Sequence, residues 1–157
     1  MLFKILNVIW LAMLPIFELR LALPFAYFKY GFNIYESFLL SVIGNMLPII
    51  FILYLLKFFV KILSKNIFFK KIFDWVFLRS EKAFSKNYAK WGKLGLIFFV
   101  GIPLPITGAW TGSIASTLFK IKTKDAFWLI FLGVLLSGVI VSTICLLFEN
   151  IALKWFL

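Results

Sequence analysis

Hydrophobic residues occur along this chain in four long stretches, and most charged residues lie between them. Two stretches contain no charged residue: residues 37–56, with 20 residues, and residues 126–148, with 23. A helix needs about 20 apolar residues to cross the hydrocarbon core of a bilayer. The pattern therefore predicts two membrane-spanning helices. Pro48 lies inside the first, where it either kinks the helix passively or frees a carbonyl for another use.

The first of the other two stretches, residues 2–28, is interrupted between Pro15 and Pro24, and the interruption holds Glu18 and Arg20. A charge near the bilayer centre costs about 3 kcal/mol, so such side chains face a cavity or a partner. The apolar arm before the break would be about 20 Å long as a helix. An arm of that length reaches only to about the middle of the membrane.

The second interrupted stretch, residues 94–119, breaks at Pro103, Pro105 and Gly108. Short segments interrupted by Pro or Gly at corresponding positions of two halves are typical of broken helices that form a transporter site. The alternative is two kinked helices that cross the membrane completely.

The charge of the connections separates these alternatives for the second stretch. Residues 57–93 hold ten basic and two acidic residues, a net charge of +8, and residues 120–125 carry +2. Strongly basic connections remain in the cytoplasm. Both ends of stretch 94–119 then lie on one side, which indicates a re-entrant hairpin. Residues 29–36 lie outside, but Lys4 alone does not fix whether Met1 is outside, as in a hairpin, or inside.

The two halves of the chain have the same order of segments: a broken stretch, a polar link and a spanning helix. A shift of 89 positions aligns Glu36 with Asp125 and Gly44 with Gly133, together with three apolar pairs. An odd number of spans between two such halves gives them opposite topology, as in an inverted repeat. The sequence predicts an all-α integral membrane protein with two re-entrant helical hairpins and spanning helices. It forms a single membrane domain, 1–157, with a first half at 1–56, a basic connection at 57–93 and a second half at 94–157.

The connection 57–93 is too charged to span the membrane. Lys57, Lys61 and Lys65 lie four residues apart, with phenylalanines and aliphatic residues between them. This pattern favours an amphipathic helix in the headgroup plane that turns its lysines toward anionic lipid headgroups. The alternative is a helix hairpin packed against protein.

Composition narrows the possible functions. The chain is 64% hydrophobic, against 45–50% for a typical soluble domain, and its net charge is +11. In a membrane protein this charge indicates cytoplasmic loops and anionic lipids as partners, with no nucleic acid. The chain has no histidine and one cysteine, Cys145, so histidine-based catalysis and histidine-ligated metals are excluded. We expect no enzymatic activity and no cofactor.

Three motifs resemble one known family. "LPIFELRLALPFAY", "IGNMLP" and "FVGIPLPITGAWTGSIAS" are similar to the bacterial and archaeal proteins described as putative small multidrug export proteins, and the resemblance covers about residues 11–145. The layout also resembles the DedA-like membrane proteins, whose two re-entrant hairpins face each other as an inverted repeat. Members of that group are implicated in moving polyprenyl-phosphate and phospholipid carriers with protons or sodium. Arg20 and Arg79 are the only arginines here, so the second arginine pair typical of DedA proteins is missing.

This resemblance implies a multi-pass protein of the prokaryotic inner membrane that transports a lipid-like or amphipathic substrate, with a proton or sodium as coupling ion. Glu18 and Arg20 would face the tip of the second hairpin. A carboxyl taken out of water holds a proton more readily, and a guanidinium suits a carboxylate or a lipid phosphate. The alternative is a pair that only pins the hairpin. The candidate substrate- or ion-binding residues are Glu18, Arg20, Pro24, Asn45, Pro103, Pro105, Thr107, Gly108, Trp110 and Thr111.

A second function class stays open, namely a non-transporting membrane scaffold or an insertase-like factor whose basic connection binds partners. A cavity lined by Glu18 and Arg20 would favour the transporter, and a tightly packed hairpin interface would favour the scaffold. A chain of this size can also require a homodimer to enclose a path.

We predict that the two basic connections lie on the same side of the membrane. In a variant without Cys145, single cysteines at Ser80 and Thr123 should both resist a membrane-impermeant thiol reagent in intact cells and react after permeabilisation. Labelling of only one of them in intact cells would mean that stretch 94–119 crosses the membrane.

Overall fold

The computed structural model describes residues 1–63, 88–104, 107–119 and 121–156. All regular secondary structure in these ranges is helical, as predicted. The elements are α1 (Leu2–Met13), α2 (Glu18–Pro24), the π-helix η1 (Phe25–Lys29), α3 (Ile34–Leu63), α5 (Tyr88–Gly101), α6 (Ala109–Leu118) and α7 (Thr123–Phe156).

Among the described residues, two helices are long and apolar enough to cross a membrane, and they coincide with the two stretches predicted to span it. The qualifying segments are Ile34–Leu56 of α3 and Thr123–Glu149 of α7. Helix α3 continues without a break from its apolar part to Leu63, so the predicted connection begins as an extension of this helix. The amphipathic pattern predicted for the rest of the connection falls largely on residues 64–87, which lie outside the described residues.

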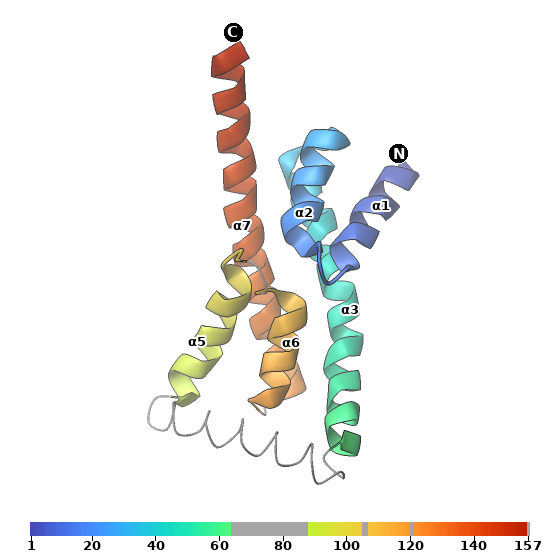
Figure 1. Ribbon diagram of the computed structural model, residues 1–157, viewed down its shortest axis with the longest axis vertical. Helices are drawn as coiled ribbons and strands as arrows, with labels where there is room; N and C mark the ends of the chain where they lie inside the picture. The colour runs from blue at the N-terminus through green and yellow to red at the C-terminus, as the bar shows by residue number, and fades with distance from the viewer. Residues whose placement is uncertain (64–87, 105–106, 120, 157) are drawn as a thin grey trace.

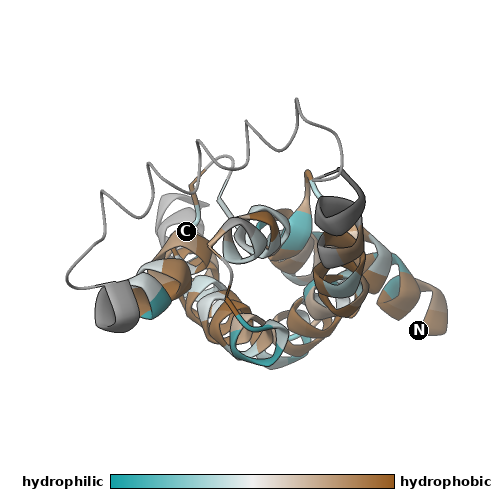
Figure 2. Ribbon diagram, turned by 90° about the horizontal axis from the view of Figure 1, so that it is seen from below, coloured by the Kyte–Doolittle hydropathy of each residue, from teal (hydrophilic) through white to brown (hydrophobic). Residues whose placement is uncertain are grey.

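Many large apolar side chains lie on the surface of the helices. Phe51 on α3 is 73% exposed, and Trp10 on α1 and Trp128 on α7 are each 61% exposed. Hydrophobic residues dominate the helices seen along the bundle in Figure 2. A water-soluble protein rarely leaves so many large apolar side chains exposed, so these positions fit contact with lipid chains.

The shorter helices form two hairpins that occupy opposite ends of the molecule (Figure 1). Helices α1 and α2 form one hairpin and α5 and α6 the other, and each hairpin packs against both long helices. The two turns lie at the same level, near the middle of the long axis, where they meet. The functional candidates in both interrupted stretches are therefore brought to one region.

The first turn is shorter than the interruption predicted between Pro15 and Pro24. Leu14 is extended (φ −74°, ψ 137°) and ends α1, because a residue before proline is disfavoured in the helical conformation. The helix resumes at Glu18, and Pro24 lies at its end, where the helix continues as η1. Proline lacks the N–H of the regular α-helical ladder, and here its position coincides with a change to π-helical bonding, which avoids a break.

Two glycines let the long helices approach the hairpins closely. A Cβ atom on Gly44 of α3 would lie 2.6 Å from the backbone oxygen of Ile9 and 2.8 Å from the Cβ of Ala12 in α1. A Cβ atom on Gly133 of α7 would lie 2.6 Å from the Cβ of Val100 in α5. Gly44 and Gly133 are the pair related by the 89-residue shift. In a bilayer, where helices do not gain by hiding from lipid, such close backbone contact supplies packing energy.

We predict that Gly44→Ala and Gly133→Ala each destabilise the protein by about 1–3 kcal/mol, because the added methyl group overpacks a helix contact. Gly95→Ala in α5 is the control, since its Cβ would meet nothing within 4 Å, and it should stabilise the helix by about 0.5–1 kcal/mol. Thermal unfolding in detergent measures all three. Equal melting temperatures for Gly133→Ala and Gly95→Ala would contradict the close packing.

Candidate functional site

The side chain of Arg20 connects the two hairpins. Its Nη1 donates a hydrogen bond to the backbone oxygen of Leu104, and its Nη2 donates one to the Thr107 hydroxyl at 3.1 Å. Both acceptors belong to the turn between α5 and α6. The planar guanidinium can hold two acceptors at once in a fixed geometry, so Arg20 fixes the orientation of the second turn relative to the first.

Thr107 organises the turn that Arg20 binds. Its Oγ1 lies 2.8 Å from the backbone oxygens of Ile102 and Leu104 and accepts a hydrogen bond from the N–H of Leu104 at 3.3 Å. A threonine hydroxyl has one proton to donate and two lone pairs to accept. The hydroxyl therefore adds to the backbone hydrogen bonds of the turn, in which the Leu104 N–H donates to the oxygen of Ile102 at 2.8 Å and the Thr107 N–H donates to the oxygen of Leu104 at 3.2 Å.

Glu18 reaches across to the start of α6. Its carboxylate Oε1 accepts a hydrogen bond from the backbone N–H of Trp110 at 3.2 Å. The N-cap residue of α6 is Gly108, which has no side chain to cap the helix, and a Cβ atom there would collide with the Glu18 carboxylate. A carboxylate at a helix N-terminus is stabilised by the unpaired N–H groups and by the helix dipole. Glu18 thus caps a helix of the other hairpin.

The backbone at Glu18 is unusual. Its φ of +47° lies in the left-handed region, and it is the only non-glycine residue with a positive φ in the described part of the chain. This conformation costs an L-residue about 1–2 kcal/mol. Strained residues of this kind persist where surrounding contacts hold them and occur frequently at functional sites. Here the contact of the carboxylate with α6 offsets the strain.

Glu18 and Arg20 also form an ion pair with each other. Glu18 Oε2 lies 3.7 Å from Arg20 Nη2, and the two side chains are 8% and 19% exposed. We call these two residues, with Thr107, Gly108 and the Trp110 N–H, the hairpin link. It places one carboxylate and one guanidinium, both largely removed from solvent, between the two halves of the molecule. Such a pair can exchange a proton or bind an anionic group once its internal contacts loosen.

The indole of Trp110 strengthens the same junction. Its Nε1 donates a hydrogen bond of 3.2 Å to the backbone oxygen of Met13, the last residue of α1. That oxygen is one of the helix-end carbonyls that have no partner within their own helix. The second hairpin therefore satisfies the end of α1, while the first hairpin satisfies the beginning of α6.

The structure brings together five of the ten predicted site residues in the hairpin link, and the other candidates lie elsewhere. Thr111 Oγ1 donates to the backbone oxygen of Gly108 at 3.3 Å, within its own helix, and Pro103 lies half-buried in the turn. Pro24 ends α2, away from these contacts, and Asn45 lies buried on α3. Pro105 lies outside the described residues.

The sequence did not predict which backbone oxygens accept hydrogen bonds from Arg20 and Trp110 in the hairpin link. The oxygens of Leu104 and Met13 are acceptors that every residue possesses, so no residue type marks them. It also missed the hydrogen bond from the Tyr27 hydroxyl to the Glu149 carboxylate, which joins η1 to the distant end of α7. A tyrosine and a glutamate 122 positions apart give no sequence pattern that would pair them.

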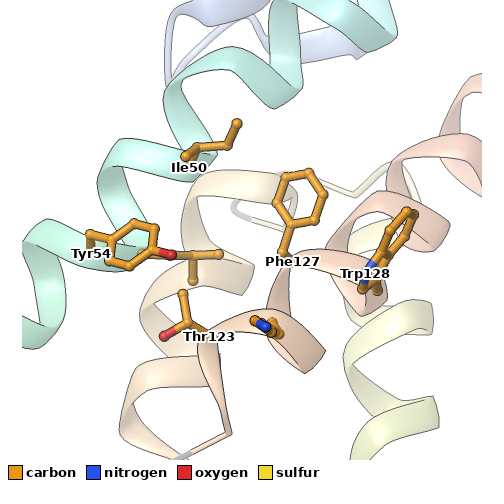
Figure 3. A pocket seen from close by; sticks show the side chains of 7 residues that line it. Ile50, Tyr54, Thr123, Phe127 and Trp128 are labelled. Carbon is orange, nitrogen blue, oxygen red and sulfur yellow. The ribbon is translucent and has the colours of Figure 1, made fainter.

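A separate cavity of about 450 Å³ lies between α3 and the first turns of α7 (Figure 3). Ile50 and Tyr54 project into it from α3, and Phe127 and Trp128 line it from α7. The remaining lining residues are Leu53, Thr123 and Lys124. The cavity is therefore mainly apolar and aromatic, with one cation, and neither Glu18 nor Arg20 lines it.

A comparison with protein families matches residues 18–140 to the family described as putative small multi-drug export protein. The chain belongs to this family. The matched region begins at Glu18 and includes the hairpin link and the residues around the cavity. No curated protein and no solved structure is significantly similar to the chain. The family match and the two apolar helices of the chain indicate a membrane protein. The name of the family indicates small-molecule export.

Within the residues that the structure describes, no three His, Cys, Asp or Glu side chains gather closely enough to hold a metal ion. The polar chemistry of the site therefore consists of the carboxylate, the guanidinium, the hydroxyl of Thr107 and backbone groups.

We predict that Thr107→Val destabilises the protein by about 1 kcal/mol, because the part-buried Arg20 Nη2 loses its acceptor and the turn loses the hydrogen bonds of the hydroxyl. Thr107→Ser keeps the hydroxyl and should remain close to the wild type in thermal unfolding. Thr143→Val is the matched control, because the Thr143 hydroxyl only donates to its own helix, at 2.8 Å from the oxygen of Val139. A Thr107→Val effect no larger than that of Thr143→Val would contradict the role of Thr107 in the link.

Proposed function

We propose that this protein is a secondary transporter that moves a lipid-like or amphipathic substrate across the prokaryotic inner membrane. The observation that carries the proposal is the hairpin link: Glu18 and Arg20, largely buried, join the turns of two short hairpins at mid-height. Ionisable residues inside a membrane protein usually mark a substrate or ion path. Interrupted helices that meet near the midplane are the recurrent architecture of such sites.

We further propose that the two halves form an inverted repeat of re-entrant hairpins, as in the DedA-like proteins. The equal offset of Gly44 and Gly133, each at a close contact with the first helix of the adjacent hairpin, supports this arrangement. Glu36 and Asp125, related by the same offset, both lie in the first turn of a long helix. Alternating access would then consist of movement of one half against the other about the link.

Protonation of Glu18 provides a mechanism for opening the link. The carboxylate accepts the Trp110 N–H and attracts Arg20 while it is charged. A protonated carboxyl is a weaker acceptor and carries no charge, so the cap on α6 and the pairing with Arg20 both weaken. Arg20 would then keep only its hydrogen bonds to neutral groups of the second turn, and an anionic group of the substrate could compete for its unpaired charge. A proton is the coupling ion that this sequence of events requires.

The cavity between α3 and α7 supports an amphipathic substrate. Three aromatic rings and two aliphatic side chains offer an apolar wall, and Lys124 adds a positive charge. Ligand sites are typically concave and apolar with a few polar groups that fix orientation. Lys124 belongs to a basic connection, which the positive-inside rule assigns to the cytoplasmic side. The cavity would thus load substrate from the cytoplasm, and no step requires enzymatic chemistry.

One observation favours the scaffold or insertase-like alternative. Both hydrogen-bonding partners of Arg20 and the acceptor of the Trp110 N–H are protein groups, so the link is complete without a substrate. A link that only holds the hairpins together would have the same contacts. The two functions differ in what happens when its charges are removed.

We predict that Glu18→Gln abolishes proton-dependent transport, measured with a fluorescent anionic lipid analogue in vesicles, while the melting temperature stays close to that of the wild type. Gln keeps the shape and an acceptor oxygen but cannot ionise. Arg20→Lys keeps the charge without the planar fork and should weaken substrate binding more than folding.

A purely structural link predicts a different result. Glu18→Gln would then leave the Arg20 charge unpaired, at a cost of about 3–5 kcal/mol for a buried pair, and the protein would express poorly. Removing both charges would recover the stability. A Glu18→Gln, Arg20→Met double variant that is stable and fully active in transport would rule out the proposed role of the pair.

A further inference from the structure

Helix α3 carries a line of buried polar side chains that the hairpin link does not use. Ser37, Ser41 and Asn45 follow one another at four-residue intervals and are 0%, 0% and 2% exposed. The oxygens Ser37 Oγ, Ser41 Oγ and Asn45 Oδ1 have no hydrogen-bond partner in the described part of the chain. We call these three residues the α3 polar line.

The polar line lies on the side of α3 that is turned toward α2. Successive residues of a helix are rotated by about 100° around its axis. Viewed along the axis of α3, the polar line therefore lies between the directions of Gly44 and Phe38. Gly44 approaches α1, and the Phe38 ring lies against Gly138 of α7. Helix α2 packs on α3 and lies between α1 and α7 in Figure 1. The three side chains are therefore enclosed by the first hairpin and α7.

Two buried serines of α6 show how a hydroxyl can be satisfied within its own helix, whereas Ser142 Oγ on α7 is a further buried oxygen without a partner among the described residues. Ser113 donates to the oxygen of Ala109 at 2.7 Å, and Ser116 donates to the oxygen of Ser113 at 2.8 Å, both within α6. These two are as buried as the polar line, at 0% and 1% exposure. An unpaired polar group in an apolar interior is expensive. Three in a row on one helix, none with a partner among the described residues, offer water a set of hydrogen-bonding groups.

We propose that the α3 polar line holds a file of water molecules that carries protons to Glu18. This inference rests on the proposed function, because it supplies the proton that would open the hairpin link. Successive residues of the line are about 6 Å apart along the helix, and its ends are about 12 Å apart. One cation held at about 2.3–2.6 Å from its ligands cannot reach all three oxygens, whereas bridging waters can.

The inner end of the line leads to the link. Pro48 has no N–H to offer the carbonyl of Gly44, four residues before it, so a further acceptor is available beside Asn45. Leu19, next to Glu18, and Met46, next to Asn45, belong to the same buried apolar cluster. A Cβ atom on Gly44, the neighbour of Asn45, would lie 2.8 Å from the Cβ of Ala12 near the end of α1. The line therefore ends near the level of the first turn, and the file of water would bridge the remaining space to the Glu18 carboxylate.

The outer end of the line is polar. Ser37 lies in the first turn of α3, beside a reciprocal cap in which Asn33 Oδ1 accepts the Glu36 N–H at 2.8 Å and Glu36 accepts the Asn33 N–H at 3.1 Å. The Glu36 carboxylate is exposed at this end. Charged groups thus lie at both ends of the proposed route, Glu36 at the outer end and the Glu18–Arg20 pair at the inner end.

The test uses the full chain in vesicles that contain a pH-sensitive dye, with an imposed pH gradient. Ser41→Ala removes the central oxygen and should lower proton uptake by about tenfold, which corresponds to a barrier increase of about 1.36 kcal/mol. Ser37→Ala is the second variant, in case the first does not fold. Ser113→Ala is the matched control, because its hydroxyl is satisfied within α6, and it should leave uptake unchanged.

Two results would overturn the proposal. One is uptake by Ser41→Ala equal to that of the wild type, together with a raised melting temperature, as expected when an unpaired oxygen is removed from a dry contact. The other is an equal loss of uptake in Ser41→Ala and Ser113→Ala, which would mean that packing and not the polar line controls uptake.

A second measurement separates this proposal from the proposed function. Transfer of nuclear magnetisation from water to the Asn45 side-chain amide, in membranes, reports hydration without any transport. Transfer in the wild type that is lost in Ser41→Val would support the water file even if Glu18→Gln transports normally and the transporter mechanism fails. No transfer in the wild type would overturn the water file and leave the proposed role of Glu18 intact.

Discussion

The contact of the Glu18 carboxylate with the N-terminus of α6 is the interaction on which the arrangement of the two halves depends. It satisfies a helix end whose own N-cap, Gly108, has no side chain, and Arg20 adds hydrogen bonds to the same turn. A bilayer offers no water to unsatisfied backbone groups. Each hairpin therefore depends on the other for hydrogen bonds to the polar groups at its turn. The left-handed backbone of Glu18 accompanies this contact at the start of α2.

Packing supports this polar contact with close contacts at small residues, in addition to a buried apolar cluster. Gly44 and Gly133 bring each long helix against the backbone of a hairpin helix, and the Phe38 ring occupies the space that Gly138 leaves open. Large aromatic side chains such as Phe51 and Trp128 lie on the outside instead. This inverts the usual distribution of a soluble protein, because lipid solvates apolar side chains as well as the protein interior does.

The proposed transport mechanism depends on the negative charge of Glu18, which also makes the hairpin link stabilising. A carboxylate that caps a helix and pairs with an arginine loses both interactions when it is protonated, so a single proton can weaken the contact between the halves. The unpartnered oxygens of α3 offer a route for that proton, and the cavity beside Lys124 offers a place for an amphipathic molecule. The polar line and the cavity share α3, whereas the link joins α2 to α6.

The sequence by itself determined the helical class, the two spans and the two interruptions, because apolar runs and prolines act locally through length and backbone geometry. It also identified Glu18, Arg20 and Thr107, since a charge or a hydroxyl beside a broken apolar run is conspicuous. It did not determine that Pro24 would be absorbed into a continuous helix or that Asn45 would lie apart from the link on a line with Ser37 and Ser41. Only the tertiary structure decided which groups pair. The partners of the site are backbone atoms such as the Leu104 oxygen and the Trp110 N–H, which every residue carries and which become specific only when two distant turns are brought together.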